Sequence, residues 1–131
     1  MITRLSIATK SREQLIDVTS DVAQAVRESG VEAGIATLFV PHTTAGITIN
    51  ENADPTVAAD ILRGLSEVVP RRASYYRHIE GNSDAHIKAS LVGSSVQVLV
   101  QNGQLLLGTW QGIYFCEFDG PRSRKLWVMI K

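Results

Sequence analysis

Three histidines are the residues of this chain whose type and setting point most directly to chemistry. His42 follows a proline and opens a Thr-rich segment, whereas His78 and His86 lie in a polar stretch rich in Gly, Asn and Asp. Neutral imidazole is the commonest metal ligand in proteins, and three imidazoles with one open coordination position form a catalytic type of site. The sequence therefore predicts a shared metal site. The alternative is three unrelated surface or capping histidines, since exposed histidine is common.

The expected metal follows from the type of donor. Three imidazoles suit Zn²⁺ or a related transition metal better than Mg²⁺, which prefers oxygen ligands. A histidine-bound metal that keeps one position for water suits hydrolysis or Lewis-acid activation of a phosphoryl or carbonyl oxygen. We therefore expect a divalent metal cofactor, with zinc preferred over magnesium.

Two carboxylates are candidates for proton transfer. Glu51 lies beyond a predicted strand and directly before a helix start, where loops often carry chemistry, and Asp84 lies two residues before His86. Each also has a structural alternative. Glu51 could be a solvated carboxylate that complements a helix dipole, and Asp84 could cap a short helix.

Four further residues are candidates for binding an anionic small-molecule substrate. Trp110 could stack on a heterocyclic ring and Gln111 could orient a ligand, whereas Arg122 and Arg124 could hold a phosphate bidentately. The alternatives are an aromatic residue of the core or an interface, an amide that satisfies a loop carbonyl, and exposed charges at a strand edge.

Length and charge exclude several classes of protein. The 131 residues fit one domain, 1–131, and thirteen basic residues balance thirteen acidic ones, so we expect no nucleic-acid partner. No apolar run approaches the ~20 residues of a membrane span, and the N-terminus lacks a signal-peptide pattern, so we expect no membrane partner. The lone Cys116 lies in a strand-like run and is expected to be a buried apolar residue in a cytoplasmic protein.

Apolar periodicity and turn residues predict an α+β fold, a single domain with a mainly antiparallel β-sheet packed with two longer helices and one short helix. Ser11 is the expected N-cap of the first helix and Gly30 its stop, Asp54 and Pro55 start the second, and Asn102-Gly103 forms a hairpin turn. The expected helices are 12–29, 56–68 and 85–92; the expected strands are 2–9, 34–40, 46–50, 96–100, 105–107, 113–118 and 125–130; residues 70–84 are an irregular connection.

Three stretches of the chain together resemble the YjbQ family, sometimes described as secondary thiamine-phosphate synthases. They are His42-Thr43-Thr44-Ala45 through Asn50-Glu51-Asn52-Ala53-Asp54-Pro55, Tyr76-Arg77-His78 through Leu91, and Gly108-Thr109-Trp110-Gln111-Gly112-Ile113 followed by Glu117 and Arg124. The resemblance covers nearly the whole chain. It implies a compact α+β fold that assembles as a homotrimer, convergence of the three histidines on one site, and weak joining of a thiazole phosphate to a pyrimidine pyrophosphate.

Two hypotheses of function follow from the residues and the resemblance. The first is a metal-dependent enzyme that acts on a small phosphorylated or heterocyclic substrate, with weak thiamine-phosphate synthase activity or with hydrolysis as its reaction. The second is a non-catalytic trimer that binds a metal or a ligand. A structural zinc site normally has four protein ligands, and Cys116 is a poor fourth, so the sequence favours the enzyme.

Overall fold

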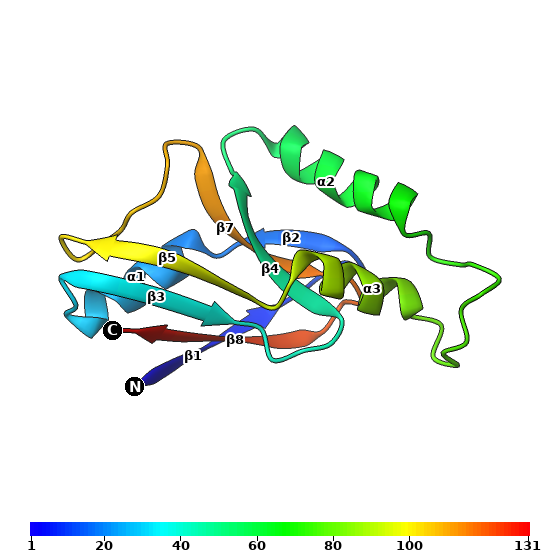
Figure 1. Ribbon diagram of the computed structural model, residues 1–131, viewed down its shortest axis with the longest axis horizontal. Coiled ribbons are helices and arrows are strands. Elements are labelled where there is room, and N and C mark those ends of the chain that lie inside the picture. Colours follow the sequence, from blue (N-terminus) through cyan, green and yellow to red (C-terminus); the bar gives the residue numbers. More distant parts are fainter.

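The chain forms eight strands and three helices in a computed structural model that describes residues 1–131 (Figure 1). None of the helices is long and apolar enough to cross a membrane. The expected α+β fold with mainly antiparallel sheets and three helices is confirmed. In chain order the elements are β1 (Ile2–Ala8), β2 (Gln14–Asp17), α1 (Thr19–Ser29), β3 (Ala33–Phe39), β4 (Ala45–Glu51), α2 (Pro55–Val68), α3 (Ser83–Val92), β5 (Ser95–Gln101), β6 (Gln104–Leu105), β7 (Gln111–Glu117) and β8 (Ser123–Ile130).

The strands form two sheets in which every pair is antiparallel. The larger sheet has the order β1-β8-β3-β5-β6, and the smaller sheet has the order β2-β7-β4. Asn102 and Gly103 turn the chain from β5 to β6 with φ angles of 55° and 71°, the left-handed region that a tight hairpin turn requires. The returning strand ends at Leu105, so it is shorter than the expected 105–107.

The strand β7 is buried on both faces and separates two hydrophobic clusters. Ile113 and Phe115 belong to the larger cluster, which α1 and the inner side of the larger sheet complete. Tyr114 and Cys116 point to the opposite side, into a smaller cluster with α3. Cys116 is fully buried, and burial raises the pKa of its thiol to about 12, so its predicted role as an apolar residue is confirmed.

The predicted helix over 12–29 is wrong in its first third. Residues Gln14–Asp17 form β2, which pairs with β7, and helix α1 begins only at Thr19. The spacing of Leu15 and Val18 fits a helix, but pairing with a distant strand overrides this local preference. Ser11 is therefore not the N-cap; Asp17 instead accepts hydrogen bonds from the Thr19 amide and hydroxyl, and the expected stop at Gly30 is confirmed.

The helices α2 and α3 cover the outer side of the smaller sheet (Figure 1). The predicted start of α2 is confirmed, because Asp54 accepts a hydrogen bond from the Thr56 amide at 2.9 Å and Pro55 opens the helix. The apolar stripe of α2 faces the sheet, yet none of its residues is fully buried. The predicted N-cap of α3 is wrong, since Asn82 holds that position and Asp84 lies inside the first turn.

Candidate functional site

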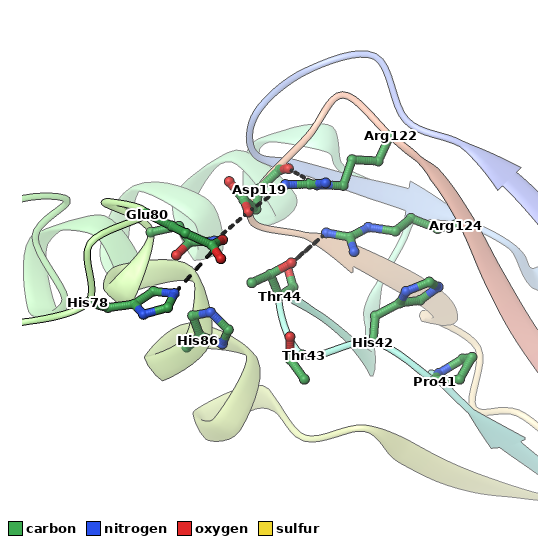
Figure 2. A pocket seen from close by; sticks show the side chains of 11 residues that line it. Pro41, His42, Thr43, Thr44, His78, Glu80, His86, Asp119, Arg122 and Arg124 are labelled. Carbon is green, nitrogen blue, oxygen red and sulfur yellow. Dashed lines mark hydrogen bonds and ion pairs between the residues drawn. The ribbon is translucent and has the colours of Figure 1, made fainter.

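The three histidines line one polar cavity of about 480 Å³. The connection from β3 to β4 supplies His42, the long connection from α2 to α3 supplies His78, and the first turn of α3 supplies His86. Strand β8 and the turn before it add Arg124 and Arg122. No hydrophobic side chain lines this cavity, called the histidine pocket below, and its walls are Pro41, His42, Thr43, Thr44, His78, Glu80, Asn82, His86, Asp119, Arg122 and Arg124 (Figure 2).

His78 and His86 form a close pair whose ring nitrogens make no hydrogen bond within the chain. Their ring centroids lie 5.3 Å apart with the rings nearly perpendicular, at 85°. Glu80 approaches this pair, with its Oε2 atom 3.9 Å from His78 Nε2. Both histidines therefore keep an uncommitted lone pair that could bind a metal or accept a proton.

His42 is held differently from the other two. Its Nε2 atom accepts a hydrogen bond of 2.8 Å from the backbone amide of Lys125 in β8. Burial, and then the positive charge of Arg124, lowers the pKa of His42 below its ordinary value. The ring is therefore neutral at pH 7, and since Nε2 accepts, the hydrogen-bond network assigns the single proton to Nδ1.

The three histidines share the pocket but do not form a metal-holding arrangement in this conformation. No group of three His, Cys, Asp or Glu side chains in the chain has the geometry to hold a metal ion. The three rings also differ in their contacts: His78 and His86 have free lone pairs, whereas the Nε2 lone pair of His42 accepts from the Lys125 amide. Of the three predicted ligands, only His78 and His86 therefore keep a ring lone pair that no group of the chain occupies.

A buried ion pair forms the floor beneath His42. Glu117 accepts hydrogen bonds from Arg124, from Thr9 at 2.8 Å and from the Asp119 amide at 3.0 Å. Burial raises the pKa of Glu117, but these hydrogen bonds outweigh burial and the net pKa is lowered. Arg124 also donates from Nη2 to Thr44 Oγ1 at 2.8 Å, which fixes the 41–44 turn, and its Nη1 donates to no group in the chain.

Arg122, Asp119 and Asn82 form a second polar contact at the pocket wall. Arg122 Nη2 and Asn82 Nδ2 both donate to Asp119 Oδ2, at 3.0 and 2.8 Å. The oxygen Oδ1 of Asn82 is buried and has no hydrogen-bond partner. An unpaired buried acceptor is costly, so this oxygen is available to a water molecule or a bound group that donates a hydrogen bond.

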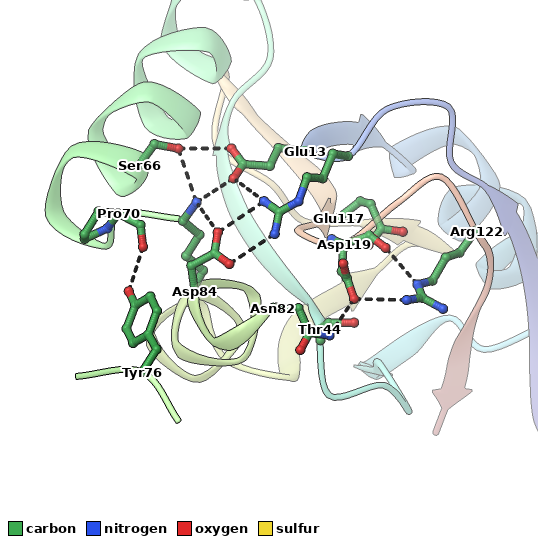
Figure 3. A network of polar contacts seen from close by, with 12 residues as sticks. Glu13, Thr44, Ser66, Pro70, Tyr76, Asn82, Asp84, Glu117, Asp119 and Arg122 are labelled. Atoms are coloured by element: carbon green, nitrogen blue, oxygen red, sulfur yellow. Dashed lines mark hydrogen bonds and ion pairs between the residues drawn. The ribbon is translucent and has the colours of Figure 1, made fainter. Parts of the chain in front are cut away.

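Asp84 does not line the pocket. It is a fully buried residue of the first turn of α3. Both its oxygens accept from Arg12 at 3.1 Å, and Lys88 Nζ lies 3.5 Å away (Figure 3). Lys88 in turn donates to Glu13 and Ser66. Burial raises the pKa of Asp84, but the hydrogen bonds and charges of Arg12 and Lys88 lower it overall. These five residues, the α3 ion-pair cluster, anchor the helix that carries His86.

Three more predicted site residues gather at the opposite end of β4. Glu51 pairs in register with Gln111, and the carbonyl of Trp110 accepts from the Asn52 amide at 3.0 Å. The length of β4, at about 3.3 Å per residue, separates Glu51 from the pocket end of the strand by about 20 Å. Gln111 Oε1 accepts from the Gly108 amide, and the Trp110 side chain is 62% exposed. Within one chain these residues are not brought to the histidines.

Several residues of the pocket were not singled out in the sequence. Thr43 and Thr44 stand beside His42, and their adjacency to it was the available signal. Glu80 and Asn82 lie in the polar run between the other two histidines, whereas Asp119 reads only as a turn residue before Gly-Pro. Thr44 and Asn82 are oriented by the distant residues Arg124 and Asp119, which no local spacing predicts.

The comparisons with known proteins agree across the whole chain. The family model described as "UPF0047 protein YjbQ-like" matches residues 3–131. The UPF0047 protein YugU of Bacillus subtilis is 54% identical over 130 residues, which cover 99% of this chain and 98% of YugU. The UPF0047 protein YjbQ of Salmonella typhimurium is 46% identical over 98 residues, which cover 71% of each chain.

Solved structures show the same fold. A YjbQ/UPF0047 family protein from Clostridium acetobutylicum has a TM-score of 0.96 and 60% identity, covering 98% of this chain and 99% of its own. A conserved hypothetical protein from Thermus thermophilus has a TM-score of 0.92 and 44% identity, with the same coverage. The chain therefore belongs to the YjbQ/UPF0047 family.

Proposed function

We propose that the protein is a metal-dependent enzyme that acts on a small phosphorylated or heterocyclic substrate in the histidine pocket. The observation that carries the proposal is the convergence of three histidines and two arginines, from separate segments, on one cavity without hydrophobic side chains. A cavity of about 480 Å³ with ten polar residues among its eleven walls suits a small anion rather than an apolar ligand.

The proposed metal is a divalent ion, with Zn²⁺ preferred over Mg²⁺, held by His78 and His86. Their lone pairs are free, and imidazole donors favour zinc. Once bound, such an ion supplies Lewis-acid polarisation of a substrate oxygen or an activated water. The sequence predicted His42 as a third ligand. Binding of the metal through Nε2 of His42 requires this atom to release its hydrogen bond from the Lys125 amide.

The protein's own side chains supply the rest of the proposed chemistry. Arg124 Nη1 and the half-exposed Arg122 offer cationic donors to an anionic group at the pocket wall. Glu80 lies beside His78 without an Arg or Lys partner, so it is the carboxylate of the pocket that is free to move a proton. A neighbouring cavity lined by Tyr75, Tyr76 and Ile87 borders His78 and His86 and suits a heterocyclic ring.

Metal content and turnover test this proposal together. Protein purified without a metal-affinity tag is expected to contain about one zinc per chain, and His78→Ala and His86→Ala are each expected to lower the content well below that. Thiamine precursors, a thiazole phosphate and a pyrimidine pyrophosphate, are the first substrates to assay, followed by phosphate monoesters. Full metal stoichiometry in both variants would remove the metal site from the proposal.

The alternative proposal is a non-catalytic protein that binds a metal or a ligand. One observation favours it: Glu117 and Asp119 are paired with Arg124 and Arg122, and Asp84 is buried, so few carboxylates remain for catalysis. Protein stripped and reloaded with Zn²⁺ or Mg²⁺ separates the two proposals. Absence of turnover together with a ligand-dependent rise in melting temperature would favour the binding protein.

Homotrimeric assembly and a cytoplasmic location complete the proposal. The resemblance described above implies a trimer, and the outer face of the larger sheet carries partly exposed apolar side chains that a second copy would cover. Among them, Phe39 is 43% exposed and lies beside Trp127 of β8, and Leu99 of β5 is 57% exposed. Sedimentation that gives only the chain mass of 14.3 kDa at micromolar concentration would remove the trimer.

A further inference from the structure

His42 differs from the other two histidines in what its ring can offer to a ligand. The Lys125 amide donates to Nε2 of His42 over 2.8 Å. A neutral imidazole has one lone-pair nitrogen and one N–H, so the committed lone pair leaves Nδ1 as a hydrogen-bond donor. A nitrogen that carries a proton does not bind a metal ion, because the metal needs its lone pair.

Other uncommitted donors accompany His42 on the same side of the pocket. The backbone amides of His42, Thr43 and Thr44 donate to no acceptor within the chain. Arg124 uses Nε and Nη2 for Glu117 and Thr44, which holds its guanidinium in place, and its Nη1 is free. All these residues line the cavity, and Figure 2 shows His42 beside Arg124, apart from the pair formed by His78 and His86.

We propose that His42 is the Nδ1–H donor of an oxyanion subsite on the 41–44 turn, where the phosphoryl group of the substrate binds, and that it is not a metal ligand. The inference rests on the proposed function and divides its pocket into two halves. The 41–44 side presents the free backbone amides, the Nδ1–H of His42 and Nη1 of Arg124, which match the acceptor oxygens of a phosphoryl group. The opposite side presents the free lone pairs of His78 and His86.

The protonation state of the ring tests the proposal in the unmodified protein. Long-range ¹H–¹⁵N correlation spectra of ¹⁵N-labelled protein identify the ring nitrogen of each histidine that carries the proton. We expect the Nδ1–H form for His42 near neutral pH. An Nε2–H form, or a doubly protonated ring, would overturn the proposal, because neither can accept from the Lys125 amide.

Two substitutions separate the two nitrogens of His42. His42→Asn keeps an N–H donor near the position of Nδ1, whereas His42→Gln keeps an acceptor near the position of Nε2. With inorganic phosphate as the probe, we expect the Asn variant to bind within about threefold of the wild type and the Gln variant about tenfold more weakly. Equal binding by the wild type and both variants, or no phosphate binding by the wild type, would overturn the proposal.

Zinc content of the same variants distinguishes this proposal from the proposed function. Both His42 variants are expected to keep the zinc of the wild type, whereas His78→Ala loses it. Loss of zinc from the His42 variants as well would make His42 a ligand and overturn the subsite while the metal site stands. Unchanged zinc in His78→Ala together with a tenfold phosphate defect in His42→Gln would remove the metal site and support the subsite.

Discussion

The two histidines of the pocket that α3 and the segment before it supply, His78 and His86, lie on the other side of this helix from the α3 ion-pair cluster. The two groups differ in whether their polar side chains are paired. In the cluster of Arg12, Glu13, Ser66, Asp84 and Lys88, each charged group contacts another, and Asp84 and Lys88 are almost completely buried. In the pocket, His78 and His86 have no hydrogen-bond partner on their rings.

The difference shows which polar residues serve structure and which remain available for a ligand. A charge that is buried with partners holds elements together, because removal of one partner leaves the other uncompensated. A polar group that lines a cavity without a partner contributes little to folding and is free to bind. The predictions below test this contrast through the free energy of unfolding, beginning with the largest expected change.

Loss of Lys88 should have the largest effect. Lys88→Ala takes the buried one of two cations from both Glu13 and Asp84, so we expect a loss of about 3–5 kcal/mol in the free energy of unfolding, measured by urea denaturation. Arg63→Ala is the matched control. Arg63 forms an exposed pair with Glu67 on α2, and its loss should cost at most about 0.5 kcal/mol. Similar losses in the free energy of unfolding of both variants would contradict the view that the buried cluster holds elements together.

Acid should destabilise the protein by a smaller amount, through the paired carboxylates. The pKa values of Asp84 and Glu117 are lowered in the folded chain, so the unfolded chain takes up protons first as the pH falls. Their stabilisation is present above about pH 4–5 and is lost as the pH falls through the folded pKa values.

Denaturation curves between pH 7 and pH 2 measure this loss. Glu117→Gln removes one contributing group, so its stability should be lower at pH 7 and depend less steeply on pH below about pH 5 than that of the wild type. Asp60→Asn, on the exposed side of α2, is the control and should follow the wild type. An identical pH dependence of stability in Glu117→Gln and the wild type would show that the ion pair of Glu117 and Arg124 does not cause the loss of stability in acid.

Substitution of the unpaired histidines should change stability little. His78→Ala and His86→Ala remove rings that make no hydrogen bond, so the metal-free variants should unfold within about 0.5 kcal/mol of the metal-free wild type. The measurement is urea denaturation in the presence of a chelator. A loss comparable to that of Lys88→Ala would assign these rings a structural role and weaken the distinction between the two regions.

Glu51→Gln should have the smallest effect on the pocket. Glu51 lies at the other end of β4, so binding of zinc and phosphate should stay within about twofold of the wild type, as measured by calorimetry. If turnover of a substrate instead falls by about 10²–10⁴-fold, Glu51 is the proton carrier that its position in the sequence suggests. It would then reach the pocket of a neighbouring subunit rather than its own.

Local signals predicted the parts of the fold that depend on a few adjacent residues. The Asp54-Pro55 start of α2, the Gly30 stop of α1 and the Asn102-Gly103 hairpin are set by backbone preferences of those residues themselves. Strand β2 was missed because its identity depends on pairing with β7, about a hundred residues later. A helical spacing of apolar residues carries no information about such a partner.

The same distinction applies to the site. The sequence indicated that His42 and His78 lie in polar connections and that His86 lies at the start of a short helix, and the structure places all three in one cavity. The commitment of one ring nitrogen of His42 depends on the amide of Lys125, 83 residues away, and no local pattern predicts it. The burial of Asp84 likewise depends on Arg12, which the sequence analysis assigned to a helix.

The double burial of β7 has a consequence for hydrogen exchange. Because its faces belong to two hydrophobic clusters, neither cluster can open without exposing this strand, so its amides should exchange with solvent only on global unfolding. Helix α2, which has no fully buried residue, should exchange through local opening. His42 precedes β4, the partner of β7, whereas His78 follows α2. We therefore expect the segment that carries His78 to open locally far more often than the segment that carries His42.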